Sequence, residues 1–210
     1  MTRPESSSTP RLGDACAVTV GAMLLPARST EPFTPTALDA RLAGRAAMYG
    51  VSELSLITVT GSGGPAYVQL QVCPSGARYR SVIENLSPRA ARDLKKGYIA
   101  NFHHPVLYAK ALRLAAVRLS ELLPISPTTR SVLLAAPAVA ATADIAENVV
   151  NLWMHEDTRR ITDATATTSS VLAAVKWTGT IGPLLYLSRG FLPLWFGAVR
   201  DRVPGWTRKS

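Results

Sequence analysis

The chain has 210 residues, of which 47% are apolar and 18% charged, and its formal net charge is +9. The apolar content is sufficient for a core, which excludes a disordered chain. Its 15 Pro and 14 Gly are scattered, which excludes collagen-like and low-complexity proteins. Two cysteines, Cys16 and Cys73, exclude a disulfide scaffold. The positive charge favours an anionic partner, either nucleic acid or an anionic membrane surface.

The N-terminal segment changes character after its first residues. Residues 1–14 are polar and rich in serine and proline, which predicts disorder. The segment 15–29 contains an apolar run that fits either a signal segment or a β-strand. In the strand interpretation, Cys16, Val18 and Val20 alternate with alanine and threonine. Both alternatives stay open at this point.

A helix is predicted over residues 35–49. Thr34 followed by a proline is a typical helix start, with threonine as the cap. Leu38 and Leu42 lie four residues apart and therefore share one face. Gly50 is expected to end the helix.

A β-hairpin is predicted next. Residues 53–60 and 66–73 have the composition of strands, and the glycine-rich segment 61–65 is expected to be the turn between them. Alternation in the second strand predicts a buried face made of Val68, Leu70 and Val72. The expected fold class is therefore α+β, with a small α+β domain over 15–86 ahead of a mainly helical half.

A basic helix is predicted to begin at Ser87, which is followed by a proline. It carries four positive side chains in eight residues: Arg89, Arg92, Lys95 and Lys96. No aromatic residues lie between them and no nucleic-acid motif accompanies them, so nucleic acid is the weaker partner. We expect this face to meet either phospholipid or water.

Two long segments with few charges dominate the second half. Residues 131–154 and 164–188 are each long enough to cross a hydrocarbon layer of ~30 Å. The stretch 98–123 is a less clear third candidate because charged residues interrupt it. Residues 190–199 are too short to cross and are expected to be re-entrant or interfacial. Residues 87–199 are thus predicted to be a membrane-embedded bundle of two to three transmembrane helices, in a multi-pass protein.

A basic tail is expected to follow this bundle. Residues 200–210 carry two further arginines, a third one near the end and a lysine. Positive residues next to a span favour one side of a membrane. They do not settle the orientation here, because the basic helix that begins at Ser87 falls on the other side if the number of spans is odd.

One helix face of residues 131–154 is polar. Its members are spaced by three, one and three residues: Asp144, Glu147, Asn148 and Asn151. If the next segment runs antiparallel, Lys176 lies at the same depth as Glu147. Ionisable residues inside membranes usually face the bundle and pair, so we expect a buried ion pair between them. The alternative is a soluble helical hairpin whose carboxylates face water.

These motifs resemble those of a group of small uncharacterised polytopic membrane proteins. The group combines a D-x-x-E-N span, here beginning at Asp144, with a later K-W, here at Lys176. The preceding Asn101-Phe102-x-x-Pro105-x-x-Tyr108 is similar to the group's aromatic entry into the previous span, although the group has aspartate in place of Asn101. The resemblance covers about 98–190 and implies no activity.

No catalytic constellation, metal site or cofactor motif is evident. His103 and His104 are adjacent, so on a helix they point about 100° apart, which disfavours shared metal ligation. Ser62 lacks the G-x-S-x-G context of a hydrolase. An enzyme is therefore disfavoured.

The leading hypothesis is an integral membrane protein with a structural or scaffolding role. Its expected partners are the lipid bilayer and, as an open possibility, further copies of the chain. One alternative is an oligomeric proton-coupled transporter built on the charges at Asp144, Glu147 and Lys176. The other is a soluble α+β protein that binds a lipid or an apolar ligand.

Overall fold

A computed structural model describes residues 33–202, and every regular element in this range is helical. The prediction of an α+β fold is therefore wrong, because the described residues form no strand. The elements are α2 (Ala37–Thr60), the 3-10 turn η1 (Gly61–Gly63), α3 (Gly64–Gln71), α4 (Gly76–Glu84), α5 (Pro88–Ala100), α6 (His104–Leu122), α7 (Pro127–Glu156), the 3-10 turn η2 (Thr158–Arg160) and α8 (Asp163–Arg202).

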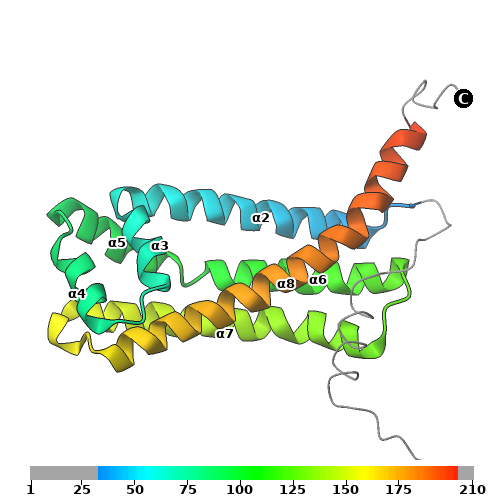
Figure 1. The fold of residues 1–210 in the computed structure, drawn as a ribbon. Coiled ribbons are helices and arrows are strands. Elements are labelled where there is room, and N and C mark those ends of the chain that lie inside the picture. Colours follow the sequence, from blue (N-terminus) through cyan, green and yellow to red (C-terminus); the bar gives the residue numbers. More distant parts are fainter. Residues whose placement is uncertain (1–32, 203–210) are drawn as a thin grey trace, which may run out of the picture.

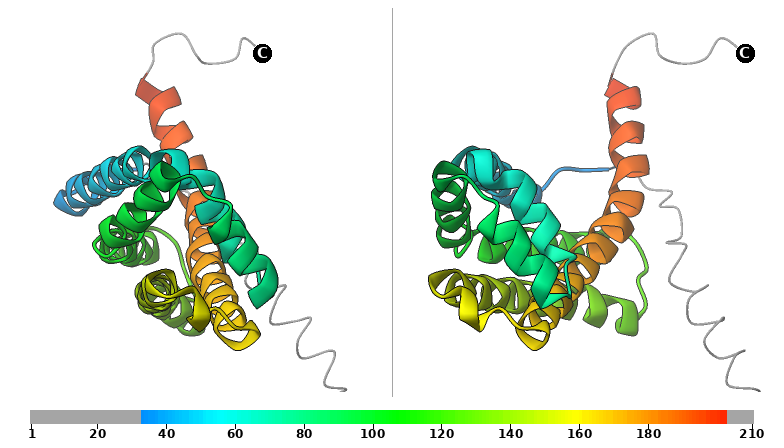
Figure 2. Two further views of the ribbon diagram at one scale, coloured as in Figure 1. Left: turned by 90° about the vertical axis from the view of Figure 1, so that its left-hand side faces the viewer. Right: turned by 60° about the vertical axis from the view of Figure 1, so that its left-hand side comes forward.

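The four long helices form an elongated bundle (Figure 1). α2, α6 and α7 lie alongside one another in that order, and α8 packs against α7 and α6, running antiparallel to α7 (Figure 2). The short helices α3, α4 and α5 gather at the end of the bundle where α7 turns into α8 (Figure 1). The last turns of α8 project beyond the opposite end.

The predicted hairpin is replaced by two helices. Residues 53–60 form the second half of α2, and residues 66–73 belong mainly to α3. Leu70 is buried as expected, but Val68 and Val72 are exposed by 66% and 76%. Ala66 and Leu70 of α3 are buried together with Cys73, which follows the end of this helix, at a spacing of four and three residues that a strand would not place on one face. Tertiary packing of that face outweighs the β propensity of the valines.

The predicted helix over 35–49 exists but does not stop at Gly50. Thr36 caps α2: its side chain accepts from the Leu38 amide at 3.3 Å, while Asp39 accepts from the Thr36 amide at 2.7 Å. Downstream, the helix continues to Thr60 because its inner face stays in contact with α6 and α5. A glycine weakens a helix by only ~1 kcal/mol, which such packing offsets.

Other sequence predictions are met in part. Ser87 caps α5 as expected and accepts from the Ala90 amide at 3.2 Å. The stretch 98–123 is not one helix, since α5 ends at Ala100 and α6 begins at His104. Residues 164–188 and 190–199 form one continuous helix, α8. The segments 1–14 and 15–29 and most of the tail 200–210 lie outside the described residues.

An arginine of α6 and a shared apolar core tie the start of α2 to the rest of the bundle. The guanidinium of Arg118, on α6, donates to Asp39 at 2.9 Å and to the backbone oxygen of Thr34 at 3.1 Å. Leu42 is buried in the same core as Tyr108 and Leu112 of α6. The N-terminal helices and the bundle therefore share one core.

The glycine-rich segment after α2 is a site of close helix packing. A Cβ atom added at Gly63 would lie 2.6 Å from the Leu94 amide nitrogen and 2.8 Å from the Ala90 carbonyl oxygen of α5. A Cβ atom added at Gly64 would meet nothing within 4 Å. Gly63 is therefore required by the contact with α5, and its neighbour is not.

We expect Gly63→Ala to destabilise the fold by ~1–3 kcal/mol, because the extra methyl group must push α5 away. Gly64→Ala is the matched control and should be neutral or slightly stabilising. Thermal unfolding of the two purified variants measures the difference. Equal stability of both variants would contradict the packing of η1 against α5.

Candidate functional site: a buried polar cluster beside a lateral cleft

The polar face predicted on α7 lies inside the bundle. Its four members are buried, with at most 2% of each residue exposed: Asp144, Glu147, Asn148 and Asn151. α7 begins after Ser126, whose side chain accepts from the Thr129 amide, and it turns this face towards α5, α6 and α8. The sequence therefore identified the interior face of α7 correctly.

Lys176 of α8 reaches this face. Its Nζ donates to Glu147 Oε2 at 2.6 Å and lies 3.7 Å from Asp144 Oδ1. Only 4% of Lys176 is exposed, so the ion pair is enclosed. α7 and α8 approach closely nearby, since a Cβ atom added at Gly179 would lie 2.9 Å from the Ala136 oxygen. The predicted contact between Lys176 and the carboxylates is confirmed by these distances.

Asn101 joins the cluster from the break between α5 and α6. Its Nδ2 donates to Asp144 Oδ1 at 2.8 Å and to Asn148 Oδ1 at 3.2 Å. An aspartate at position 101 would set a second carboxylate against Asp144. Asparagine supplies a donor instead, which is what a buried carboxylate requires.

A second set of polar side chains continues the cluster towards the turn between α7 and α8. Asn151 Oδ1 accepts from Ser169 Oγ at 2.7 Å and from the Tyr79 hydroxyl at 3.0 Å. The Tyr79 hydroxyl also lies 3.3 Å from His155 Nε2. Sequence analysis missed Ser169 and Tyr79. The signal for Ser169 was its helical spacing with Ala173 and Lys176, all buried on one face of α8.

Next to the cluster, two adjacent histidines at the start of α6 contact α2. Ser52 Oγ lies 3.0 Å from His104 Nδ1 and 3.3 Å from His103 Nε2. His104 Nε2 lies 3.1 Å from Glu53, whose side chain is 45% exposed. The adjacent histidines thus share one serine of α2.

A cleft opens beside the cluster. It has a volume of about 520 Å³ and lies between α2, α3, α6 and α8. Asn101, His104, Asp144 and Lys176 line it with polar groups, and apolar side chains complete the lining, among them Leu56, Ile57, Val68, Val72 and Trp177. Trp177 is fixed at this site because its indole N–H donates to Gln71 at 2.8 Å.

A second cleft of about 200 Å³ adjoins the first. It lies between α2, α6 and α8, and its lining is almost entirely apolar, from Leu42 to Phe191 and Trp195. Both clefts share Tyr49, Tyr108 and Thr180. The larger cleft, which carries a few polar groups on a mainly apolar lining, and the smaller apolar cleft thus meet at three residues.

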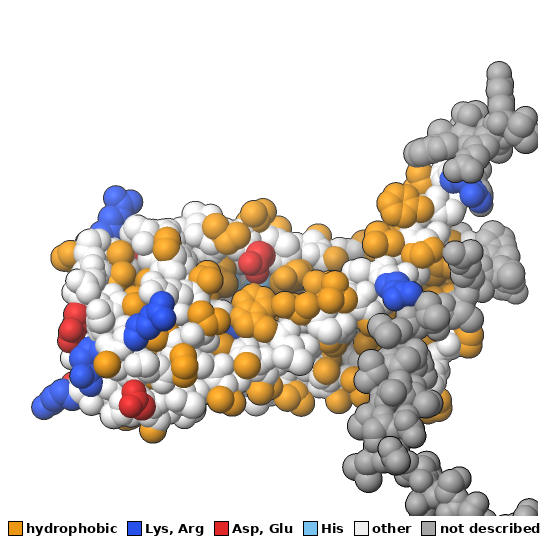
Figure 3. Space-filling view, in the orientation of Figure 1, with side chains coloured by type: hydrophobic (Ala, Val, Ile, Leu, Met, Phe, Trp, Pro, Cys, Tyr) orange, Lys and Arg blue, Asp and Glu red, His pale blue; other side chains and the backbone are white. Residues whose placement is uncertain are grey.

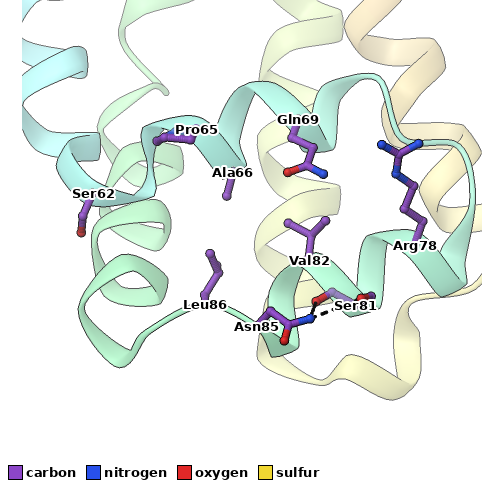
Figure 4. Close-up of a pocket in the computed structure, with 9 residues that line it drawn as sticks. All are labelled: Ser62, Pro65, Ala66, Gln69, Arg78, Ser81, Val82, Asn85 and Leu86. Carbon is purple, nitrogen blue, oxygen red and sulfur yellow. Dashed lines mark hydrogen bonds between the residues drawn. The ribbon is translucent and has the colours of Figure 1, made fainter.

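A third hollow lies between α3 and α4 at the end of the bundle (Figure 4). Ala66 and Gln69 of α3 face Leu86 and Val82 across it. The neighbouring Asn85 already donates to the Ser81 backbone oxygen at 2.7 Å. None of the residues that line this hollow has a buried polar side-chain atom without a hydrogen-bond partner.

The basic residues of α5 do not join the cluster. All four are exposed: Arg89, Arg92, Lys95 and Lys96. Asp93 lies 3.9 Å from both Arg89 and Lys96 and also accepts from Ser62 at 2.8 Å. Their expected contact with a membrane surface stays a prediction.

Comparisons with protein-family models, curated proteins and solved structures gave no match to this chain. The resemblance over 98–190 therefore stays a prediction, and the function must be argued from the site itself.

The ion pair can be tested by a double-mutant cycle. Lys176→Met should lower the free energy of unfolding by ~3–5 kcal/mol, because it leaves two buried carboxylates without their cation. Adding Glu147→Gln should recover much of this loss, and adding Asp144→Asn should recover less, since Asp144 is the more distant partner. Unfolding of the detergent-solubilised variants measures the coupling. Strictly additive losses in both double variants would contradict the pairing.

Proposed function

We propose that this chain is a multi-pass integral membrane protein with a structural role, in which the buried polar cluster fixes how the helices pack. One observation carries the proposal. Along the middle of α7 and α8, the charged and amide side chains are buried and the outer faces carry exposed apolar side chains, whereas a water-soluble protein keeps charged groups mainly on its surface.

The exposed surface of the bundle supports this setting. Large apolar side chains are exposed along three helices: Met48, Val51, Leu54 and Ile57 on α2, Val139 and Val149 on α7, and Val175, Ile181, Leu184 and Leu185 on α8. On the face shown in Figure 3, apolar side chains spread over the middle around one acidic side chain, and the other charged side chains lie towards the two ends. Apolar patches of this extent mark contact with lipid or with another protein.

The helix lengths match a bilayer. Residues 131–155 of α7 and 164–188 of α8 contain no exposed Asp, Glu, Lys or Arg, and each stretch is ~37 Å long. A hydrocarbon layer is ~30 Å thick. Among the helices of residues 33–202, α7 alone is long and apolar enough by length and composition to cross a membrane, with a mean hydropathy of 1.4 over its best window. α8 is the second span of the proposal, because its one charged residue in this stretch, Lys176, is paired inside the bundle.

The turn between α7 and α8 has the polarity of a membrane-water boundary. Asp157 accepts from the Arg159 guanidinium at 2.8 Å, and this hydrogen bond lowers the pKa of the Asp157 carboxyl to about 2. Arg160 lies over the Trp153 ring, 5.1 Å from its centroid. An arginine beside tryptophan is typical of the interfacial zone.

The role proposed for the cluster is orientation of the helices. Two carboxylates and two asparagines on α7 would each cost free energy in contact with lipid. Lys176, Asn101 and Ser169 offset this cost by contacting those side chains. They can do so only when α7 and α8 are rotated about their axes so that these faces meet. The cluster therefore specifies one arrangement of helices that could otherwise slide in an apolar medium.

A proton-coupled carrier is the second candidate. The observation that favours it is the break between α5 and α6, which places Asn101 at the depth of the ion pair and beside the cleft. Broken helices at this depth form the sites of many transporters.

We expect the protein to stay in the membrane pellet after washing with carbonate at high pH. Val139→Lys should reduce the amount of inserted protein, because a lysine facing lipid costs ~2.5–3.5 kcal/mol. Thr128→Lys, at the start of α7, is the matched control and should insert normally.

Release of the unmodified protein into the carbonate supernatant would contradict the proposal. So would equal insertion of both lysine variants, because Val139 is 56% exposed and a lysine at an exposed site of a soluble protein is harmless.

A further inference from the structure

We propose that the two adjoining clefts bind one amphipathic molecule whose polar end is a single uncharged hydroxyl group and whose body is an apolar chain. The hydroxyl group sits beside Asn101, Tyr108 and Thr180, and the chain follows the apolar cleft between α2, α6 and α8. The inference rests on the proposed membrane setting, because such a molecule would reach the clefts from the lipid phase.

Unpartnered polar atoms at the cleft carry the first step. Seven buried side-chain atoms in residues 33–202 have no hydrogen-bond partner, and three of them belong to residues lining the large cleft: Asn101 Oδ1, Tyr108 Oη and Thr180 Oγ1. Only 1% of Asn101 and 5% of Tyr108 are exposed. Folded proteins leave few buried polar atoms unpaired, so three beside one cleft indicate a missing partner.

The hydrogen-bonding capacity of these atoms selects the ligand group. Because the Asn101 amide nitrogen already donates to Asp144 and Asn148, its free atom is the acceptor oxygen. The Tyr108 and Thr180 hydroxyls can each donate. A ligand hydroxyl has one donor and two acceptor positions, so it complements all three atoms.

Other head groups fit less well. A carboxylate has no donor for Asn101, and it would meet Asp144 and Glu147 with only Lys176 to offset them. Glu53 adds a further carboxylate to the cleft lining. An ammonium group has no acceptor for the hydroxyls of Tyr108 and Thr180. The charge distribution therefore disfavours fatty acids and leaves alcohols.

The apolar cleft supplies the place for the chain. It shares Tyr108 and Thr180 with the larger cleft and extends along α8 to Phe191 and Trp195. From Thr180 to Trp195 the helix rises ~22 Å, so a hydrocarbon chain can follow this cleft, which at about 200 Å³ encloses part of the chain. A bound water could satisfy the three polar atoms, but it would make no use of this second cleft.

The chain offers two matched pairs of variants. Tyr108→Phe removes the hydroxyl that would donate to the ligand; its control is Tyr186→Phe, on a part-buried tyrosine that lines neither cleft. Ala46→Trp fills the apolar cleft; its control is Ala47→Trp, the neighbouring exposed residue outside both clefts.

The experiment is binding of tritiated oleyl alcohol to the full-length protein in phosphatidylcholine nanodiscs, with unlabelled oleyl alcohol, oleic acid and octadecene as competitors. We expect saturable binding with one site per chain. Affinity should fall about tenfold in Tyr108→Phe, the effect of one lost buried hydrogen bond, and at least as much in Ala46→Trp. Both controls should bind normally, and oleic acid and octadecene should compete at least tenfold more weakly.

The inference is wrong if binding does not saturate, if Tyr108→Phe and Ala46→Trp bind like their controls, or if oleic acid competes equally well. A rise in stability of Tyr108→Phe without saturable binding would identify the unpartnered atoms as a water site. These results are separable from membrane residence, because a protein that stays in the carbonate pellet and fails to bind overturns this inference alone.

Discussion

The contact on which the rest of the structure depends is the enclosed ion pair between α7 and α8. Lys176 lies 2.6 Å from Glu147 and 3.7 Å from Asp144, and all three are buried. Burying three charges is unfavourable unless each finds partners, which restricts both the rotation and the axial register of the two helices. Asn101 extends the same constraint to the junction of α5 and α6. One set of polar contacts thereby aligns three segments that are distant in sequence.

The same contacts determine which side chains of α7 and α8 face outwards. With the polar residues of α7 and α8 turned inwards, their outer faces present valine, leucine and tryptophan. In the proposed membrane setting, those faces need no covering, and the polar interior supplies the specificity that apolar packing lacks. The larger cleft lies between α2, α3, α6 and α8, so the cluster that orders the helices also provides polar groups in the lining of a lateral site.

Sequence patterns predicted the interior better than the outer elements. The spacing of Asp144, Glu147 and Asn151, with matched depth for Lys176, was enough to predict the central ion pair, because helix geometry fixes which residues share a face. The same reasoning failed for 53–73, where alternating valines favoured strands. A short apolar run fits both the two-residue repeat of a strand and the 3.6-residue repeat of a helix. Only the burial of Ala66, Leu70 and Cys73 decides for the helix. The parts played by Tyr79 and Thr180 depend on contacts between segments and could not be predicted from local sequence.

The central claim is that α7 and α8 enclose the polar cluster between them and face lipid on their outer sides. Spin labels on cysteines at Val139 and Val175 test it most directly, in a chain carrying Cys16→Ala and Cys73→Ala and reconstituted in bilayers, with Thr128 as the reference site near the end of α7. We expect collisions with oxygen to exceed those with a water-soluble nickel chelate at Val139 and Val175, and the reverse at Thr128. Greater access of the nickel chelate at Val139 and Val175 would show that these faces meet water, and the membrane arrangement would be wrong.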